Sequence, residues 1–183
     1  MPRTITLVRH GRSAHVHTGW LDFDGFLRWR ESYELAPIAD DDLPPRELCT
    51  LAENAAIVAS NAPRAITSAQ RLAPDREVTI SPLLRELELP PPRMFNLRLP
   101  PLVWALAFLL RGLRPSGEEA QRAAEAAKLL DTLAREKGSV VAATHGAVRP
   151  AIARELVRLG WAHDGGRRGT HHWSAWTLTM PAA

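Results

Sequence analysis

Short apolar runs recur along the chain, and polar residues bound each of them. The first covers residues 5–8 and stops at Arg9 and His10, and three later runs have the same character (55–59, 77–80 and 139–143). Runs of this length that are rich in β-branched residues are typical of buried strands. The alternating tail at residues 173–179 is typical of a half-buried strand. The pattern therefore predicts five strands, several of which end beside chemically useful side chains.

Between these strands the pattern becomes that of helices. A proline, favoured in a first turn, opens a predicted helix over residues 63–72. Ser116 and Glu119 have the spacing of a capping box, and small apolar residues then fall on one side as far as Gly138. A further helix is predicted over residues 148–159, with a proline in its first turn and a glycine as its stop. Strands that alternate with helices imply an α/β fold in which helices layer a sheet.

Length and composition are those of one globular domain. The chain has 183 residues, of which 45% are hydrophobic and 23% charged, so it is long enough to bury most of its apolar surface. Because we find no internal repeat and no linker, residues 1–183 are predicted to form a single domain, with a variable cap or loop region at about residues 87–114. The N-terminal segment lacks the long apolar core of a secretory signal, and we expect a cytoplasmic location.

Charge and cysteine content exclude several classes of protein. The formal net charge is +3, which gives no argument for a nucleic-acid-binding surface or a polybasic membrane tail. The apolar stretch at residues 102–110 is too short for a membrane span, which needs about 20 residues. Cys49 is the only cysteine, so we expect a small packed residue there. We therefore expect neither nucleic acid nor a membrane as a partner.

The residues after the first strand suit phosphoryl transfer. A phosphoryl group in transit carries negative charge, so its site needs cationic donors, a nucleophile or positioned water, and an acid for the leaving oxygen. His10 is the candidate nucleophile, since a neutral imidazole nitrogen can attack phosphorus. Arg9 supplies a guanidinium fork for phosphate oxygens, and Gly11 lets the backbone approach closely. By itself, a His-Gly pair at a strand end is more often a turn than an active site.

The context of this triplet is more specific. The motif LVRHGRS at residues 7–13, directly after an N-terminal strand, resembles the signature of the histidine phosphatase superfamily, which includes the cofactor-dependent phosphoglycerate mutases. Residues 60–69 resemble the second block of that family, in which Arg64 is a second phosphate-binding arginine at a helix start. Residues 144–146 resemble the second-histidine block, so His145 would donate to the phosphoryl oxygens. The resemblance implies a three-layer sandwich with a mostly parallel central sheet flanked by helices.

The acid is the least well matched element. The segment at residues 84–89 resembles the one that carries the family's proton donor, with Glu86 at the matching position. The family usually continues with an aromatic residue, a glycine and a Trp-Glu-Gly-like turn, whereas this chain has three prolines. If the segment is extended, Glu88 points to the same side as Glu86 and is an alternative acid. A plain role for Glu88, as an exposed carboxylate near arginines, is equally open.

The resemblance implies a two-step reaction without a cofactor. His10 would attack a phosphomonoester in line, Glu86 or Glu88 would protonate the leaving alcohol, and water would hydrolyse the phosphohistidine. Arg12 and Ser13 are expected to add contacts to the substrate. The family's chemistry needs no metal, and we give a metal site little weight. The residues considered for it were His15 with His17, the pair His171-His172 and the solvated-loop candidates Asp40 to Asp42.

Three functions follow in order of preference. The first is hydrolysis of a phosphorylated small molecule, the second is a protein phosphohistidine phosphatase acting on a phosphoprotein, and the third is a non-catalytic phospho-ligand-binding or scaffold domain. A protein substrate needs an open site, whereas a small ester prefers walls and a lid. Mutase activity is less expected because mutases of this family are longer. Residues 102–110 are predicted as a core helix, with a lid or an interface as alternatives, and a homodimer stays open.

Overall fold

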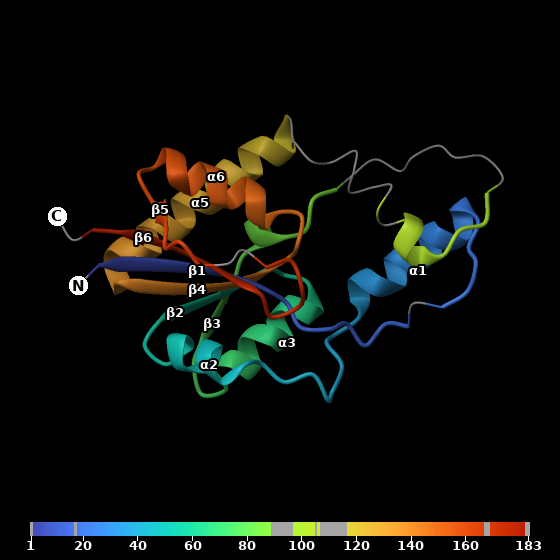
Figure 1. Cartoon of the computed structure of the whole chain (residues 1–183), viewed down its shortest axis with the longest axis horizontal. Helices are drawn as coiled ribbons and strands as arrows, with labels where there is room; N and C mark the ends of the chain where they lie inside the picture. The colour runs from blue at the N-terminus through green and yellow to red at the C-terminus, as the bar shows by residue number, and fades with distance from the viewer. Residues whose placement is uncertain are drawn as a thin grey trace.

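A computed structural model gives the fold of the chain, and it describes residues 2–16, 18–88, 97–104, 106, 117–166 and 169–181. The centre is a six-stranded sheet with the order β3-β2-β4-β1-β6-β5 (Figure 1). Four neighbouring strands run parallel, β6 is antiparallel to β1, and β5 is antiparallel to β6. The strands are β1 (Arg3–Arg9), β2 (Ala56–Ala59), β3 (Val78–Ile80), β4 (Ser139–Thr144), β5 (Ala162–His163) and β6 (Ala175–Met180).

The register of the central strands decides which residues meet at the carboxyl edge of the sheet. Arg9 of β1 lies opposite Thr144 of β4, and Ala59 of β2 lies opposite Ala143 of β4. Parallel strands end at the same edge, and ligands bind beside that edge in open α/β sheets. The residues that follow β1, β2 and β4 are therefore brought together there.

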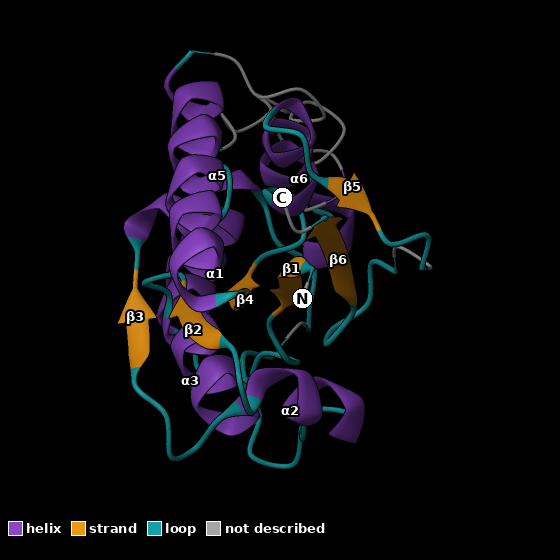
Figure 2. Ribbon diagram, turned by 90° about the vertical axis from the view of Figure 1, so that its left-hand side faces the viewer, coloured by secondary structure: helices purple, strands orange, loops and turns teal. Residues whose placement is uncertain are grey.

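Helices cover both faces of the sheet, as Figure 2 shows. On one face lie α5 (Glu118–Lys137) and α6 (Arg149–Arg158), which pack against each other and, through α5, against β1 and β4. On the other face lie α2 (Arg46–Ala52) and α3 (Pro63–Leu72), which contact β4. The three-layer α/β sandwich with a mostly parallel sheet, expected from the sequence, is confirmed.

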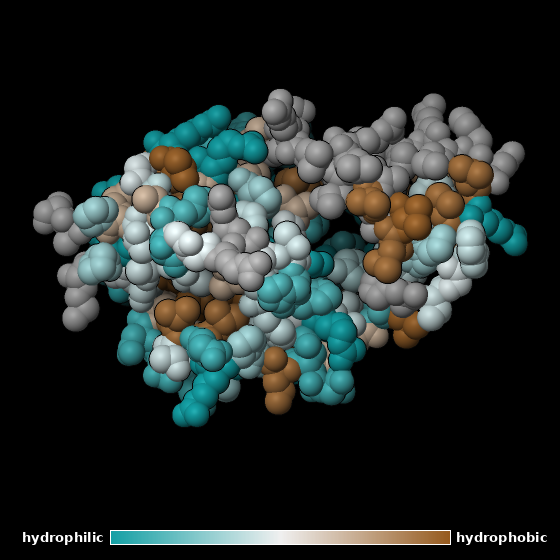
Figure 3. Space-filling view, viewed as in Figure 1, coloured by the Kyte–Doolittle hydropathy of each residue, from teal (hydrophilic) through white to brown (hydrophobic). Residues whose placement is uncertain are grey.

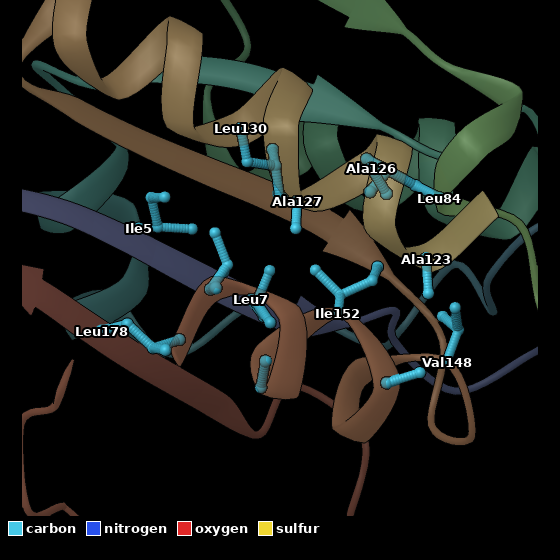
Figure 4. Packing of buried hydrophobic residues seen from close by; sticks show 14 of the residues in the cluster. Ile5, Leu7, Leu84, Ala123, Ala126, Ala127, Leu130, Val148, Ile152 and Leu178 are labelled. Atoms are coloured by element: carbon cyan, nitrogen blue, oxygen red, sulfur yellow. The ribbon is translucent and has the colours of Figure 1, made fainter. Parts of the chain in front are cut away.

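Each face of the sheet has its own hydrophobic core. The larger core lies under α5 and α6, where small alanines let α5 approach the strands closely (Figure 4). Ile5 and Leu7 of β1 point into it and are fully buried. The second core includes Val8 from the same strand, packed among residues of α2 and α3. This alternation of apolar residues on both faces explains why the sequence shows continuous apolar runs.

A third cluster lies apart from the sheet, between α1 (Phe23–Leu35) and the segment 97–104. Its aromatic rings are stacked, with Phe26 between Trp104 and Trp29 at centroid distances of 5.5 Å on either side. Leu21 and Leu99 exchange backbone hydrogen bonds of 3.0 and 2.9 Å, which join the two segments. Figure 3 shows hydrophobic side chains gathered over this part of the surface. We call α1 with residues 97–104 the cap.

The helix boundaries agree with the sequence except at two places. The helix α5 begins at Glu118 after Gly117, Ser116 of the predicted capping box lies outside the described residues, and Glu119 pairs with Arg122. The helices α1 and α2 were not predicted at all. Of the predicted cap region at residues 87–114 and the apolar stretch 102–110, most residues lie outside the described part of the chain.

Candidate active site

Two buried histidines meet at the carboxyl edge of the sheet. His10 follows β1 and His145 follows β4, with exposed fractions of 1% and 0%. Their ring centroids are 5.1 Å apart and their planes are inclined by 64°. The parallel pairing of Arg9 with Thr144 makes the next residue of each strand a neighbour of the other. Two motifs 135 positions apart in the sequence, counted from His10 to His145, are thus joined in one site.

The hydrogen bonding of His10 leaves one ring nitrogen ready to attack. His10 Nδ1 lies 2.7 Å from the carbonyl oxygen of Gly11, and a carbonyl oxygen can only accept, so Nδ1 carries the proton. Burial, followed by the charge of Arg64, lowers the pKa of His10 well below its ordinary value. The imidazole is therefore neutral near pH 7, and its Nε2 keeps a lone pair.

His145 is placed to donate a hydrogen bond. Its Nε2 lies 2.9 Å from Ser60 Oγ, which already accepts from the Ala62 amide at 3.3 Å. Among the described residues, His145 Nε2 is the hydrogen-bonded neighbour that can accept the hydroxyl hydrogen of Ser60, and this assignment puts the imidazole proton on Nδ1. That Nδ1 is buried and has no hydrogen-bond partner among the described residues. Burial, and then the charge of His10, lowers the pKa of His145 well below its ordinary value.

Arg64, in the first turn of α3, joins this site to the cap. Its terminal nitrogens donate to the end of α1: Nη2 to the Glu34 carboxylate at 3.0 Å and Nη1 to the Tyr33 carbonyl at 3.2 Å. The guanidinium also lies over the Tyr33 ring, 4.4 Å from its centroid. Its Nε is buried without a partner among the described residues. The fork of Arg64 holds the cap, and Nε is left as a donor for a ligand.

Arg9 provides a second guanidinium beside His10, on a side chain that is half-buried. Its terminal nitrogen Nη1 donates to the carbonyl of Thr170, and its Nε is buried without a partner in the described part of the chain. Gly146 packs against it, and a Cβ at that position would be in ordinary van der Waals contact with Arg9 Nε at 3.4 Å. The charge of Arg9 contributes to the lowered pKa of His10. Arg9 of β1 and Arg64 of α3 therefore both place a positive charge close to His10.

The signature loop depends on close packing around Gly11. A Cβ on Gly11 would lie 2.4 Å from Asp42 Oδ2 and 2.7 Å from the Trp173 ring, so no side chain fits there. The Asp42 carboxylate accepts from the Arg12 amide at 2.5 Å and from Trp173 Nε1 at 2.7 Å. The Gly11 amide donates to Ser68 Oγ at 2.9 Å. Residues 40–42 were expected to form a solvated loop with an N-cap; Asp40 and Asp41 are exposed, whereas Asp42 is half-buried and fastens the signature loop.

The two candidate acids lie in different surroundings. The carboxylate of Glu86 accepts from the amides of Ala147 and Val148, at 3.3 and 3.0 Å, where α6 begins. Burial raises the pKa of Glu86, and this outweighs the backbone hydrogen bonds and the charge of Arg64, which lower it. Glu88 is 61% exposed in its side chain and pairs with Arg85 at 2.6 Å. Glu86 is therefore the carboxyl group that can hold a proton beside the histidines.

The backbone that carries Glu86 is fixed from α5. Arg122 Nη1 donates to the carbonyls of Leu83 and Arg85, at 3.0 and 2.8 Å, and its Nη2 donates to the carbonyl of Glu86 at 3.2 Å. These bonds hold the turn that follows the 3-10 helix η1 (Pro82–Leu84). An arginine that binds three backbone carbonyls between Leu83 and Glu86 leaves little freedom for the acid's position.

Other predicted residues are not joined to this group. The guanidinium of Arg12 pairs with Asp41 at 2.7 Å, and Ser13 Oγ accepts from the His15 amide at 3.1 Å. Within the described residues, no three His, Cys, Asp or Glu side chains form a group that could hold a metal ion. His17 lies outside these residues. No helix in the same part of the chain is long and apolar enough to cross a membrane.

The buried histidines should make the fold sensitive to acid. Because the pKa values of His10 and His145 lie below the ordinary 6.5, the unfolded chain binds more protons as the pH falls below that value. Stability is then full above pH 6.5 and falls by about 1 kcal/mol per histidine between pH 6.5 and 5.5. Urea unfolding at about pH 7.5 and 5.5 measures this.

A matched pair of variants makes the measurement specific. His145→Gln should lose less stability on acidification than the wild type, whereas His171→Gln, at an exposed position, should follow the wild type. Equal loss in wild type and His145→Gln would show that His145 is not held neutral in the fold.

Several residues of the site were not predicted from the sequence. Glu34 and Tyr33 lie in a helix that no motif indicated, and only the spacing of aromatic residues at 23, 26, 29 and 33 could have revealed it. His172 was considered only as a metal ligand, yet its ring centroid lies 5.7 Å from that of His10. A histidine pair directly before the last strand was the available signal.

Comparisons with known proteins agree on the fold. No family model matches the sequence, and no curated protein matches it. Among solved structures, an ecdysone phosphate phosphatase from Bombix mori, in complex with tungstate, has a TM-score of 0.58 at 13% identity and covers 98% of this chain and 92% of its own. A mycobacterial glucosyl-3-phosphoglycerate phosphatase, in complex with VO3, has a TM-score of 0.55 at 18% identity, covering 96% and 92%.

A third structure is a mutant phosphoserine phosphatase from Entamoeba histolytica in complex with phosphoserine. Its TM-score is 0.51 at 16% identity, and the match covers 95% of this chain and 89% of that one. All three comparisons span nearly the whole chain, so the likeness includes the sheet and the helices on both of its faces. The fold that the motifs implied is confirmed: the chain has the fold of the histidine phosphatases and phosphoglycerate mutase-like proteins.

Proposed function

We propose that this protein is a phosphatase that hydrolyses phosphomonoesters through a covalent phosphohistidine on His10. His10 Nε2 attacks the phosphorus atom in line, and the bond between phosphorus and the ester oxygen breaks. Glu86 gives its proton to the leaving alcohol. Water then gives a proton back to Glu86 as it attacks the phosphohistidine, and the bond between phosphorus and Nε2 breaks to release phosphate and restore His10. Arg9, Arg64 and His145 stabilise the negative charge on the phosphoryl oxygens.

The observation that carries this proposal is a set of unpaired buried donors around one nucleophile. Arg9 Nε, Arg64 Nε and His145 Nδ1 are all buried and have no partner among the described residues. All three side chains exert a charge effect on His10 or lie against its ring. Unpaired buried donors cost stability, so their gathering beside His10 supports an anionic ligand at that place.

The other buried arginines do not share this arrangement. Arg122 and Arg149 also leave Nε without a partner in the described chain. Their terminal nitrogens bind backbone carbonyls, and Arg122 Nη2 also binds the Glu119 carboxylate. The unpaired donors of Arg9 and Arg64 are distinguished by their effect on the pKa of His10.

The cap favours a small ester over a protein surface. Tyr33 stacks on Trp29 at 5.4 Å and lies under Arg64, so an aromatic wall stands directly beside a phosphate-binding arginine. A walled site supports a phosphorylated small molecule whose alcohol has apolar parts, and it disfavours the alternative of a protein phosphohistidine substrate. A cytoplasmic location is part of this proposal.

The test is hydrolysis of p-nitrophenyl phosphate, first with EDTA present and then, in separate assays without EDTA, with orthovanadate as inhibitor. We expect turnover by the wild type, competitive inhibition by orthovanadate, and a decrease in kcat/KM of about 10²-fold in Arg64→Ala, as for loss of one preorganised donor. Arg135→Ala is the control, since Arg135 lies exposed on α5 and pairs only with Asp131.

A wild type without turnover that still binds orthovanadate would favour the non-catalytic phospho-ligand-binding domain. Activity that disappears with EDTA and returns with a divalent metal would contradict the metal-free reaction. Equal kcat/KM in Arg64→Ala and Arg135→Ala would remove Arg64 from the site.

A further inference from the structure

A second histidine neighbour of His10 comes from the loop before β6. The ring centroid of His172 lies 5.7 Å from that of His10, and the two planes are inclined by 42°. His172 also contributes to the lowered pKa of His10. Its side chain is only half-buried, unlike those of His10 and His145. No motif of the sequence gave this residue a part in phosphoryl transfer.

The loop that carries His172 is tied to β1 on both sides of that residue. The Arg9 amide donates to the Ser174 carbonyl at 3.0 Å, and the Trp173 amide donates to the Arg9 carbonyl at 3.1 Å. The Arg9 guanidinium binds the carbonyl of Thr170. The residues before and after His172 are therefore fixed to the residue that precedes His10.

Trp173 holds this loop in a strained conformation. Its φ is 60°, which makes it the only non-glycine residue with a positive φ among those described. A bulky residue in this region costs about 1–2 kcal/mol. Such strain persists only where the surroundings determine it, and it gathers at functional sites. Here the Trp173 ring packs against Gly11, and its Nε1 donates to the Asp42 carboxylate. The backbone of Trp173 is hydrogen-bonded to that of Arg9.

A buried arginine holds the same loop from behind. Arg149 Nη1 donates to the Ser174 carbonyl at 2.7 Å, and its Nη2 donates to the Gly169 carbonyl at 3.2 Å. Burial, and then the charge of Arg9, lowers the pKa of Arg149 to about 10. Burying a guanidinium is costly. The buried Arg149 and the strained Trp173 both hold one short loop, and among its described residues His172 lies beside the nucleophile.

We propose that His172 is a further phosphoryl-binding residue of this site, donating a ring N–H to a non-bridging oxygen of the substrate and of the phosphoenzyme. This inference rests on the proposed function and adds a residue to it. His145 would supply a fully buried donor and His172 a half-buried one, so the phosphoryl group on His10 would have a histidine from β4 and another from the β6 loop as donors. Loss of one such hydrogen bond corresponds to a free energy of about 1.4 kcal/mol, or tenfold in affinity.

The test compares His172→Ala, His172→Gln and His171→Ala. His171 is the matched control, because it is the adjacent residue of the same loop and is exposed. We expect the inhibition constant of orthovanadate and the KM of p-nitrophenyl phosphate to rise about tenfold in His172→Ala. His172→Gln, which keeps an N–H donor, should recover part of the loss, and His171→Ala should stay within about twofold of the wild type. Thermal unfolding of all four proteins shows whether the loop is intact.

The results of this test distinguish failure of the role of His172 from failure of the proposed function. Unchanged orthovanadate affinity in His172→Ala, in an active wild-type background, would overturn the role of His172 and leave the proposed function standing. A Gln variant as weak as the Ala variant, with the same melting temperature as the wild type, would show that an N–H donor at this position does not restore binding and would also overturn the proposed hydrogen bond. A wild type that neither turns over p-nitrophenyl phosphate nor binds orthovanadate would remove the proposed function itself.

Discussion

His10→Ala should lower kcat/KM for p-nitrophenyl phosphate by ~10⁴-fold or more, because the variant lacks the atom that forms the covalent bond with phosphorus. The lone pair on Nε2 exists only because Nδ1 donates to Gly11 and because burial and Arg64 keep the ring neutral. His145 cannot replace it, since its Nε2 is engaged by Ser60. Initial rates at several substrate concentrations measure the effect.

Two further proteins make the result interpretable. His163→Ala changes a histidine on β5, outside the site, and should keep wild-type rates. A circular dichroism spectrum and melting temperature close to those of the wild type would show that His10→Ala folds. Equal rates in wild type and a folded His10→Ala would rule out covalent catalysis by this residue.

Glu86→Gln should lower the rate by about 10³-fold for an alkyl phosphate and by much less for p-nitrophenyl phosphate. An alkoxide is a poor leaving group and needs the proton of Glu86, whereas nitrophenolate leaves without one. Glu88→Gln is the matched control, since Glu88 is exposed and pairs with Arg85. Rates on both substrates for both variants measure the difference.

The pH profile gives an independent view of the same acid. Burial raises the pKa of Glu86, so the protonated form persists to higher pH than in an ordinary carboxyl group. With alkyl phosphate, the wild-type rate should fall as the pH rises through that pKa, and Glu86→Gln should lack this fall. A larger effect in Glu88→Gln than in Glu86→Gln would reverse the assignment of the acid.

Site residues that directly follow a strand could be predicted from the sequence. His10 and His145 each follow an apolar run, and parallel pairing of those runs is enough to bring them together. The choice between Glu86 and Glu88 could not be made in this way. It depends on the amides of Ala147 and Val148 and on burial, which come from a helix about sixty residues later in the chain.

The cap and its contacts could not be predicted from the sequence, for a different reason. The helix α1 mixes aromatic and charged residues and buries only Phe26 completely, so it has no clear apolar face of its own. Its position is set by tertiary contacts, namely the stacking of Trp104 on Phe26 and the bonds from Arg64 to Tyr33 and Glu34. Propensity is a weak guide where such contacts decide.

The role of the β6 loop has a similar origin. His172 and Trp173 follow no motif, and the strained φ of Trp173 exists only because Arg9, Asp42 and Arg149 hold the surrounding loop. Local rules fail most at functional and strained sites, where tertiary structure imposes a conformation that the local sequence does not favour. The sequence could mark His172 as unusual, and the structure was needed to place it beside His10.

The most direct test of the account is to trap the phosphoenzyme. Wild type, His10→Ala and Glu86→Gln are mixed with excess p-nitrophenyl phosphate and quenched in alkali, in which phosphohistidine survives. Intact mass and peptide mapping then locate any phosphoryl group. We predict one phosphoryl group per chain on His10 in the wild type, lost on brief exposure to acid and absent from His10→Ala. A phosphoryl group on another residue, or turnover by the wild type with no phosphoenzyme at any time, would contradict the covalent role of His10.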